Sequence, residues 1–237
     1  MTLSKLGVSP QMYARAAGFL YLVVIAAGIL AQMGISGRIV VEGDATATSN
    51  NILMHKDLFQ MGFTIYQIEM MCQIAQVVLF YILLKPVNKN LALLALVFSL
   101  IGSIIKTLSR LFYISPLLVL GGSHYLSVFD AGQLQALALL LLNLNNQAAG
   151  IALVFFGFST FLNGYLFFQS MLLPRILGVL SMLGGLGWLT FIYPPLGNQL
   201  FLYVLPIALL GSGLQIFWLL LKGVDIRQWE KLELAAE

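Results

Sequence analysis

Long apolar runs, separated by short polar or turn-forming segments, make up most of the chain. Each run approaches the roughly 20 residues that a helix needs to cross the ~30 Å hydrocarbon core of a membrane. The strands of a membrane barrel would instead be segments of about ten residues with alternating polarity. The pattern predicts an all-α integral membrane protein, a six-transmembrane-helix bundle forming a single transmembrane domain over residues 1–237. The expected spans are residues 14–34, 58–84, 91–115, 147–169, 174–193 and 199–221.

The apolar stretch over residues 132–170 is too long for one of these spans. As a single helix its 39 residues would extend ~58 Å, against a hydrocarbon core of ~30 Å. The polar run at residues 143–147 (Asn-Leu-Asn-Asn-Gln) is the expected break. It would leave residues 132–142 as an extra short helix before the fourth span. That piece is too short to cross, so we expect it to be interfacial or re-entrant, with a seventh span as the open alternative.

Composition agrees with a membrane location and excludes several classes of site. Hydrophobic residues make up 60% of the chain and charged residues only 9%, whereas soluble domains have about 25% charged residues. The net charge is +3, but the basic residues occur singly, so the expected partner is the lipid bilayer and not nucleic acid. The single cysteine, Cys72, excludes an intramolecular disulfide and a CxxC metal or redox site.

The positions of the basic residues predict an orientation. With six spans, eight of the twelve Lys and Arg residues fall on the side of the two termini and two fall on the other side. The remaining two, Lys106 and Arg110, lie within the third span. Because basic residues are enriched in cytoplasmic loops, this distribution predicts cytoplasmic N- and C-termini.

The second and third spans each carry a stripe of polar side chains. Residues that follow one another at offsets of three or four lie on one face of a helix. The second span has such a series, and the third span repeats the same offsets. The members are Tyr66, Glu69, Gln73 and Gln76 in the second span, and Ser99, Ser103, Lys106, Arg110 and Tyr113 in the third.

A short turn at residues 86–89 joins these two spans, so we expect them to be antiparallel neighbours. Glu69 lies 16 residues before Lys85, and Lys106 lies 17 residues after Lys89. At 1.5 Å per residue these separations are ~24 Å and ~26 Å. Glu69 and Lys106 are therefore predicted to lie at the same depth and to form an ion pair.

Charges at membrane depth are costly unless paired or hydrated, so these groups should face the interior of the bundle. The Glu69–Lys106 pair could be purely structural. Alternatively, because two cations share one carboxylate, the excess positive charge could hold a small anionic or amphipathic ligand in a polar pocket between the two spans. Glu69 could also act as a catalytic acid or base. The predicted ligand-binding residues are Glu69, Lys106, Arg110, Tyr66, Gln73 and Tyr113.

The leading functional hypothesis is ligand binding that serves transport or sensing. A non-catalytic structural or partner subunit of a membrane complex is the alternative, and an intramembrane enzyme acting on a lipid-like substrate is the third. No catalytic residue, metal ligand or cofactor is predicted. His55 and His124 lie in separate loops, and the segment that begins at Gly157 lacks the second glycine of G-x-S-x-G.

Two further features predict packing. Glycines recur at intervals of seven residues in the fourth and fifth spans, where small residues let helix backbones approach closely. These are Gly150, Gly157 and Gly164, and then Gly178 and Gly185. In the charged tail, Trp229 is expected to be an interfacial anchor.

Several short stretches, distributed over nearly the whole chain, resemble an uncharacterised bacterial membrane family known as domain of unknown function 4386. This resemblance implies a multi-pass protein of the bacterial cytoplasmic (inner) membrane. It supplies no activity, cofactor or site residue. The stretches are Arg15–Tyr21, Gly43–Ala45, Leu84–Val87, Phe155–Gly157, Gly164–Leu166, Leu173–Val179 and Trp218–Gly223.

Overall fold

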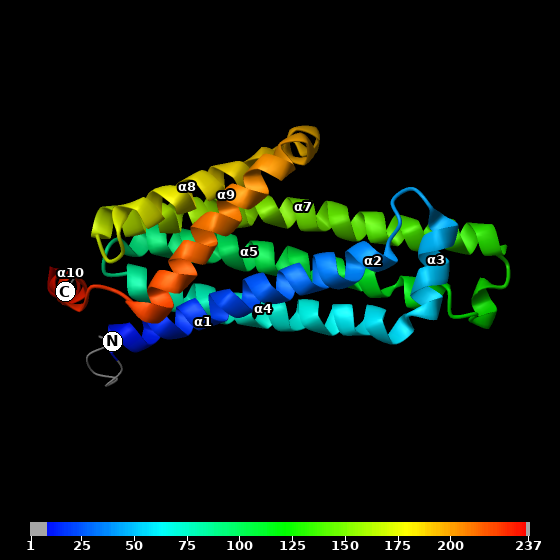
Figure 1. The fold of residues 1–237 in the computed structure, drawn as a ribbon, viewed down its shortest axis with the longest axis horizontal. Coiled ribbons are helices and arrows are strands. Elements are labelled where there is room, and N and C mark those ends of the chain that lie inside the picture. Colours follow the sequence, from blue (N-terminus) through cyan, green and yellow to red (C-terminus); the bar gives the residue numbers. More distant parts are fainter. Residues whose placement is uncertain (1–8, 236–237) are drawn as a thin grey trace. The chain divides into compact units, whose positions relative to one another are not determined.

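The computed structural model describes residues 9–235, which form helices and turns without a β-strand (Figure 1). Six of the helical segments are long and apolar enough to cross a membrane, which confirms the predicted all-α, six-helix membrane protein. The helices are α1 (Pro10–Ile29), the π-helix η2 (Leu30–Ser36), α2 (Gly37–Ile39), α3 (Ala45–Met54), α4 (Lys56–Leu84), α5 (Lys89–Ile114), α6 (Pro116–Val119), η3 (His124–Leu126), α7 (Ala131–Ser170), α8 (Arg175–Leu189), η4 (Thr190–Ile192), α9 (Pro194–Leu221) and α10 (Ile226–Ala235).

The predicted break in the fourth span is wrong. Residues 131–170 form one continuous helix of 40 residues, α7, so residues 132–142 are neither a separate interfacial helix nor a re-entrant one. The polar run at 143–147 remains helical because Asn145 is buried and its side chain is hydrogen-bonded within the protein. At 1.5 Å per residue α7 is ~60 Å long, about twice the hydrocarbon thickness, so part of it extends beyond the membrane core.

The contacts of the chain divide it into two compact units. Among the described residues, the first unit contains residues 9–23, 72–103 and 151–235. The second unit contains residues 24–71 and 104–150. Helices α1, α4, α5 and α7 each contribute residues to both units.

In the first unit, helices α7 and α8 are in backbone contact through glycines, as the sequence pattern predicts. A Cβ atom added to Gly164 would lie 2.8 Å from the carbonyl oxygen of Gly178, and one added to Gly178 would lie 2.7 Å from that of Gly164. Gly157 and Gly185 face each other in the same way. Side chains at these positions would therefore force the two helices apart.

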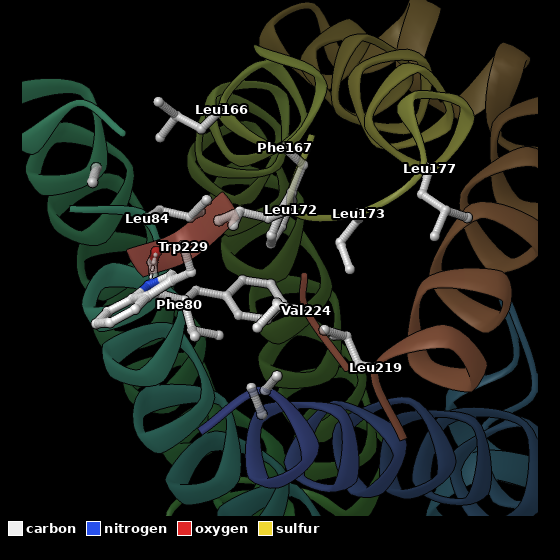
Figure 2. Close-up of a cluster of buried hydrophobic side chains, with 14 residues drawn as sticks. Phe80, Leu84, Leu166, Phe167, Leu172, Leu173, Leu177, Leu219, Val224 and Trp229 are labelled. Carbon is white, nitrogen blue, oxygen red and sulfur yellow. Dashed lines mark hydrogen bonds between the residues drawn. The ribbon is translucent and has the colours of Figure 1, made fainter. Parts of the chain in front are cut away.

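The core of the first unit also includes one side chain of the C-terminal helix, α10. Trp229 of α10 is 2% exposed and packs in a cluster with Phe80, Leu84 and Leu172 (Figure 2). Its indole Nε1 donates a hydrogen bond to the carbonyl oxygen of Leu83 at 3.2 Å. Trp229 is thus a core residue, and the expectation of an interfacial anchor is wrong.

The second unit is closed at one end by the short polar helix α3, which runs across the direction of α2 in Figure 1. Asp44 caps α3 by accepting a hydrogen bond from the backbone N–H of Ala47 at 2.8 Å. The hydroxyl of Thr48 contacts both backbone groups of Val41, and Asn51 donates to the carbonyl oxygen of Ile39. The core beneath includes Ala31, Ile35, Ile39, Ile52, Phe59, Tyr66, Tyr113 and Leu142.

Candidate functional site

A buried ion pair lies in the second unit, between the polar stripes of α4 and α5. The ammonium of Lys106 donates to Glu69 Oε1 at 2.6 Å, which confirms the pair predicted from the hairpin. The Glu69 side chain is 4% exposed and that of Lys106 is 19% exposed. The second carboxylate oxygen of Glu69, Oε2, is buried and has no hydrogen-bond partner among the described residues.

A glycine of helix α1 packs against this carboxylate. A Cβ atom added to Gly28 would lie 3.1 Å from Glu69 Oε1, closer than most Cβ contacts in proteins. The first span therefore forms a third wall around the ion pair, which the sequence pattern of α4 and α5 did not reveal.

Arg110 lies one helical turn beyond Lys106 and is almost completely buried, with 2% of its surface exposed. Its Nη1 donates to Asn145 Oδ1 of α7 at 2.9 Å, and its guanidinium carbon lies 3.6 Å from the centre of the Tyr66 ring. Within residues 9–235, no carboxylate oxygen lies within 4.0 Å of the guanidinium. Its Nε is buried without a hydrogen-bond partner in this part of the chain.

A network of hydroxyl and amide groups adjoins Arg110. The Tyr66 hydroxyl donates to Gln32 Oε1 at 2.7 Å, and the Ser36 hydroxyl lies 3.3 Å from the hydroxyls of both Tyr66 and Tyr113. The Tyr113 ring stacks on Phe59 with 4.4 Å between ring centres. These contacts fix the orientation of both tyrosines that the sequence assigned to the site.

Gln32 and Ser36 come from η2, a π-helical segment that continues α1. π-Helical turns are rare overall, but those that do occur are often found at functional sites. Their extra residue per turn interrupts the regular ladder of backbone hydrogen bonds. Sequence reasoning missed these two residues. Their only signal was two polar side chains four positions apart in an apolar run.

A cavity of about 300 Å³ lies beside this network in the second unit. Of the six predicted site residues, Tyr113 alone is among those that line it, so the cavity does not lie simply between α4 and α5 as expected. Arg110 is one hydrogen bond away, through Asn145. The lining residues are Gln32, Ser36, Gly37, Val40, Glu42, Gly43, Tyr113, Leu139, Leu142, Asn143, Asn145 and Asn146.

Gln73 is the one predicted site residue that belongs to the first unit. Its Nε2 donates to the hydroxyl of Ser99 at 3.4 Å, and the hydroxyl of Ser103 donates to the carbonyl oxygen of Ser99 at 2.8 Å. Gln73 is therefore joined to the polar stripe of α5 by its bond to Ser99. The described residues contain no cluster of His, Cys, Asp or Glu side chains that could hold a metal ion.

Residues 16–223 match a protein family described as Domain of unknown function (DUF4386). The chain belongs to the DUF4386 family. The match includes Glu69, Lys106, Arg110 and every residue that lines the cavity, whereas α10 lies beyond it. No curated protein and no solved structure matches this DUF4386 chain. The description of the family assigns no activity, and the six apolar helices support a multi-pass membrane protein.

Proposed function

We propose that this DUF4386 protein binds a small anionic or amphipathic ligand in the cavity of the second unit, as a step in transport or sensing. The observation that carries the proposal is the buried guanidinium of Arg110, which lacks a carboxylate partner among the described residues. A buried cation is costly unless a counter-charge or water compensates it. An anionic ligand in the adjacent cavity would supply that compensation.

The cavity wall has the chemistry for such a ligand. Asn145 accepts from Arg110 through its amide oxygen and donates through its amide nitrogen to Asn146 Oδ1 at 3.1 Å. The hydroxyls of Ser36 and Tyr113 add hydrogen-bond donors. Val40, Leu139 and Leu142 supply an apolar part of the wall, which suits an amphipathic molecule.

Electrostatics favour a negative group at the inner end of this cavity. Lys106 and Arg110 together carry one more charge than Glu69 neutralises. Glu42 also lines the cavity, but it is exposed, so water screens its charge. In this proposal Tyr113 and Asn145 contact the ligand. Arg110 and Lys106 provide the positive field that attracts it, and the negative charge of Glu69 sets the strength of that field.

Thermal unfolding of the purified protein in detergent tests the proposal with oleate, taurocholate and citrate as probes. At least one probe should raise the melting temperature of the wild type in a saturable way. A ligand at 100 times its Kd stabilises the folded state by about 2.7 kcal/mol. The rise should vanish in Arg110→Gln and shrink in Tyr113→Phe, which keeps the ring on Phe59 and removes only the hydroxyl.

Arg15→Gln is the matched control, because it removes the same charge from an exposed arginine that belongs to the first unit and does not line this cavity. It should retain the full effect of the probe. If no probe stabilises the wild type, or if Arg110→Gln and Tyr113→Phe respond as strongly as Arg15→Gln, the ligand site does not exist.

The closed geometry of the Glu69–Lys106 pair favours a second candidate, a non-catalytic structural or partner subunit. A 2.6 Å contact beside Gly28 satisfies one carboxylate oxygen without any ligand. Under this candidate Glu69→Gln would lower the stability of the protein, and no probe would restore it.

We also propose that the protein resides in the bacterial inner membrane with both termini in the cytoplasm. Eight basic residues lie near or beyond the ends of the spans on the side of the termini, and two lie near the ends on the opposite side. An excess of this size in short loops is the usual determinant of orientation.

A further inference from the structure

A second cavity, of about 410 Å³, lies in the first unit, where the end of α7, the start of α8, the end of α9 and the start of α10 meet. It has no part in the ligand site proposed above. Two loops form it, residues 171–174 and residues 222–225. The loops are joined by a hydrogen bond from the backbone N–H of Asp225 to the carbonyl oxygen of Leu172 at 3.1 Å.

The loop at 222–225 is held in a fixed shape. Gly223 has a positive φ of 72°, a conformation that glycine adopts without strain. The side chain of Gln11 accepts a hydrogen bond from the backbone N–H of Val224 and donates one to the carbonyl oxygen of Lys222. Asp225 caps α10 by accepting from the backbone N–H of Gln228 at 3.0 Å. The cavity wall is therefore formed before any ligand binds.

The lining combines cationic and apolar groups in one place. Arg175 and Lys222 supply two positive charges, while the one lining carboxylate, Asp225, is engaged as the helix cap. Leu172, Leu173 and Val224 are buried and give the cavity an apolar floor. The mouth thus carries a net positive charge over an apolar base.

The cavity lies at the ends of membrane spans, and this position determines which part of the lipid bilayer it faces. Three candidate membrane spans end or begin there, at Ser170, Arg175 and Leu221. Helix ends of this kind lie at the level of the lipid headgroups. Large apolar side chains next to the cavity are exposed on the described surface, as expected where acyl chains cover them. They are Met171, Ile176, Trp218 and Leu221.

We propose that this cavity binds the phosphate-bearing headgroup of an anionic phospholipid. Arg175 and Lys222 pair with the phosphate, Trp218 lies beside the glycerol region, and the acyl chains follow the exposed side chains of Ile176 and Leu221. Basic pockets between membrane helices are suited to such headgroups. Because Arg175 and Lys222 are both exposed, they reach the lipid without a change in the core.

Native mass spectrometry of the purified protein, titrated with phosphatidylglycerol or phosphatidylcholine, tests this proposal. Phosphatidylglycerol should bind as a retained, saturable adduct, and phosphatidylcholine should bind much more weakly. Since a basic residue near an anionic lipid surface contributes about fivefold in affinity, the double variant Arg175→Gln/Lys222→Gln should lose roughly 25-fold. The double variant Lys85→Gln/Lys89→Gln removes two charges elsewhere in the first unit and should bind like the wild type.

Three results would overturn the proposal. Equal binding of phosphatidylcholine would remove the role of the anionic headgroup. Equal losses in the two double variants would indicate a general charge effect. The third result is that millimolar inorganic phosphate displaces phosphatidylglycerol and binds with the same affinity when no lipid is present. That result would identify a site for free anions. None of these outcomes depends on Arg110, so this test and that of the ligand site succeed or fail separately.

Discussion

At the scale of single residues, three charges in the second unit differ in how they are compensated. Glu69 and Lys106 compensate each other at 2.6 Å, whereas Arg110 relies on one amide oxygen and one aromatic face. A guanidinium over a tyrosine ring gains up to about 2 kcal/mol when the site is desolvated. That gain is smaller than the cost of burying a full charge, so Arg110 is the member of the group whose charge no opposite charge compensates.

A double-mutant cycle should separate the ion pair from Arg110. Removing one partner leaves the other charge buried and unpaired, so Glu69→Gln and Lys106→Met should each lower the free energy of unfolding by about 3 kcal/mol. The double variant should lose much less than the sum of the two, because neither charge remains. Denaturant-induced unfolding in detergent micelles measures all four proteins. Additive losses would show that the two residues do not interact.

At the scale of elements, α7 is the helix on which sequence and structure differ most. Its polar run was expected to end a helix, because Asn residues favour caps and turns over helix interiors. The run continues instead, because Arg110 of α5 binds Asn145 and because Asn146 accepts from Asn145. The partner of Asn145 lies 35 positions away in the chain, so no local pattern could have indicated it.

The contact between α7 and α8 gives a prediction at this scale. A methyl group at Gly164 would lie 2.8 Å from backbone atoms of α8, and backbone atoms cannot move aside cheaply. Gly164→Ala should therefore destabilise the protein by about 1–3 kcal/mol, as overpacking usually does. Gly213→Ala is the matched control, since an added Cβ there meets nothing within 4 Å.

The control should be neutral or stabilising by up to about 1 kcal/mol, because alanine favours a helix more than glycine does. Both variants are compared with the wild type by thermal unfolding in the same detergent. If Gly164→Ala behaves like Gly213→Ala, the close approach of α7 and α8 is incorrect.

At the scale of the whole molecule, hydropathy located the spans because a helix in lipid must be apolar over its full length. The hairpin count also located Glu69 opposite Lys106, since a short turn fixes the register of α4 against α5. The cavity could not be predicted from hydropathy or from the register of the hairpin. It depends on Gln32 and Ser36, which a π-helical turn presents, and on Asn145, which a distant arginine holds in the helix.

Orientation is also a property of the whole molecule, and single-cysteine labelling can test it. The natural cysteine, Cys72, is replaced by Ser, and a new cysteine is placed at Asn90 or at Val128, which are both exposed. With cytoplasmic termini and six spans, residue 90 begins the third span inside the cell and residue 128 lies in an outer loop. A membrane-impermeant maleimide should label Val128→Cys in intact cells.

The same reagent should label Asn90→Cys only after the cells are lysed, because the membrane separates it from the medium. Denatured samples provide the control that both cysteines are reactive. If Asn90→Cys is labelled in intact cells and Val128→Cys is protected, the orientation of the protein is opposite to the one proposed. The reversed orientation would also move the predicted depth of Arg110, which lies 21 residues after Lys89, from the outer to the inner part of the membrane. The ligand cavity would then receive its anion from the cytoplasm.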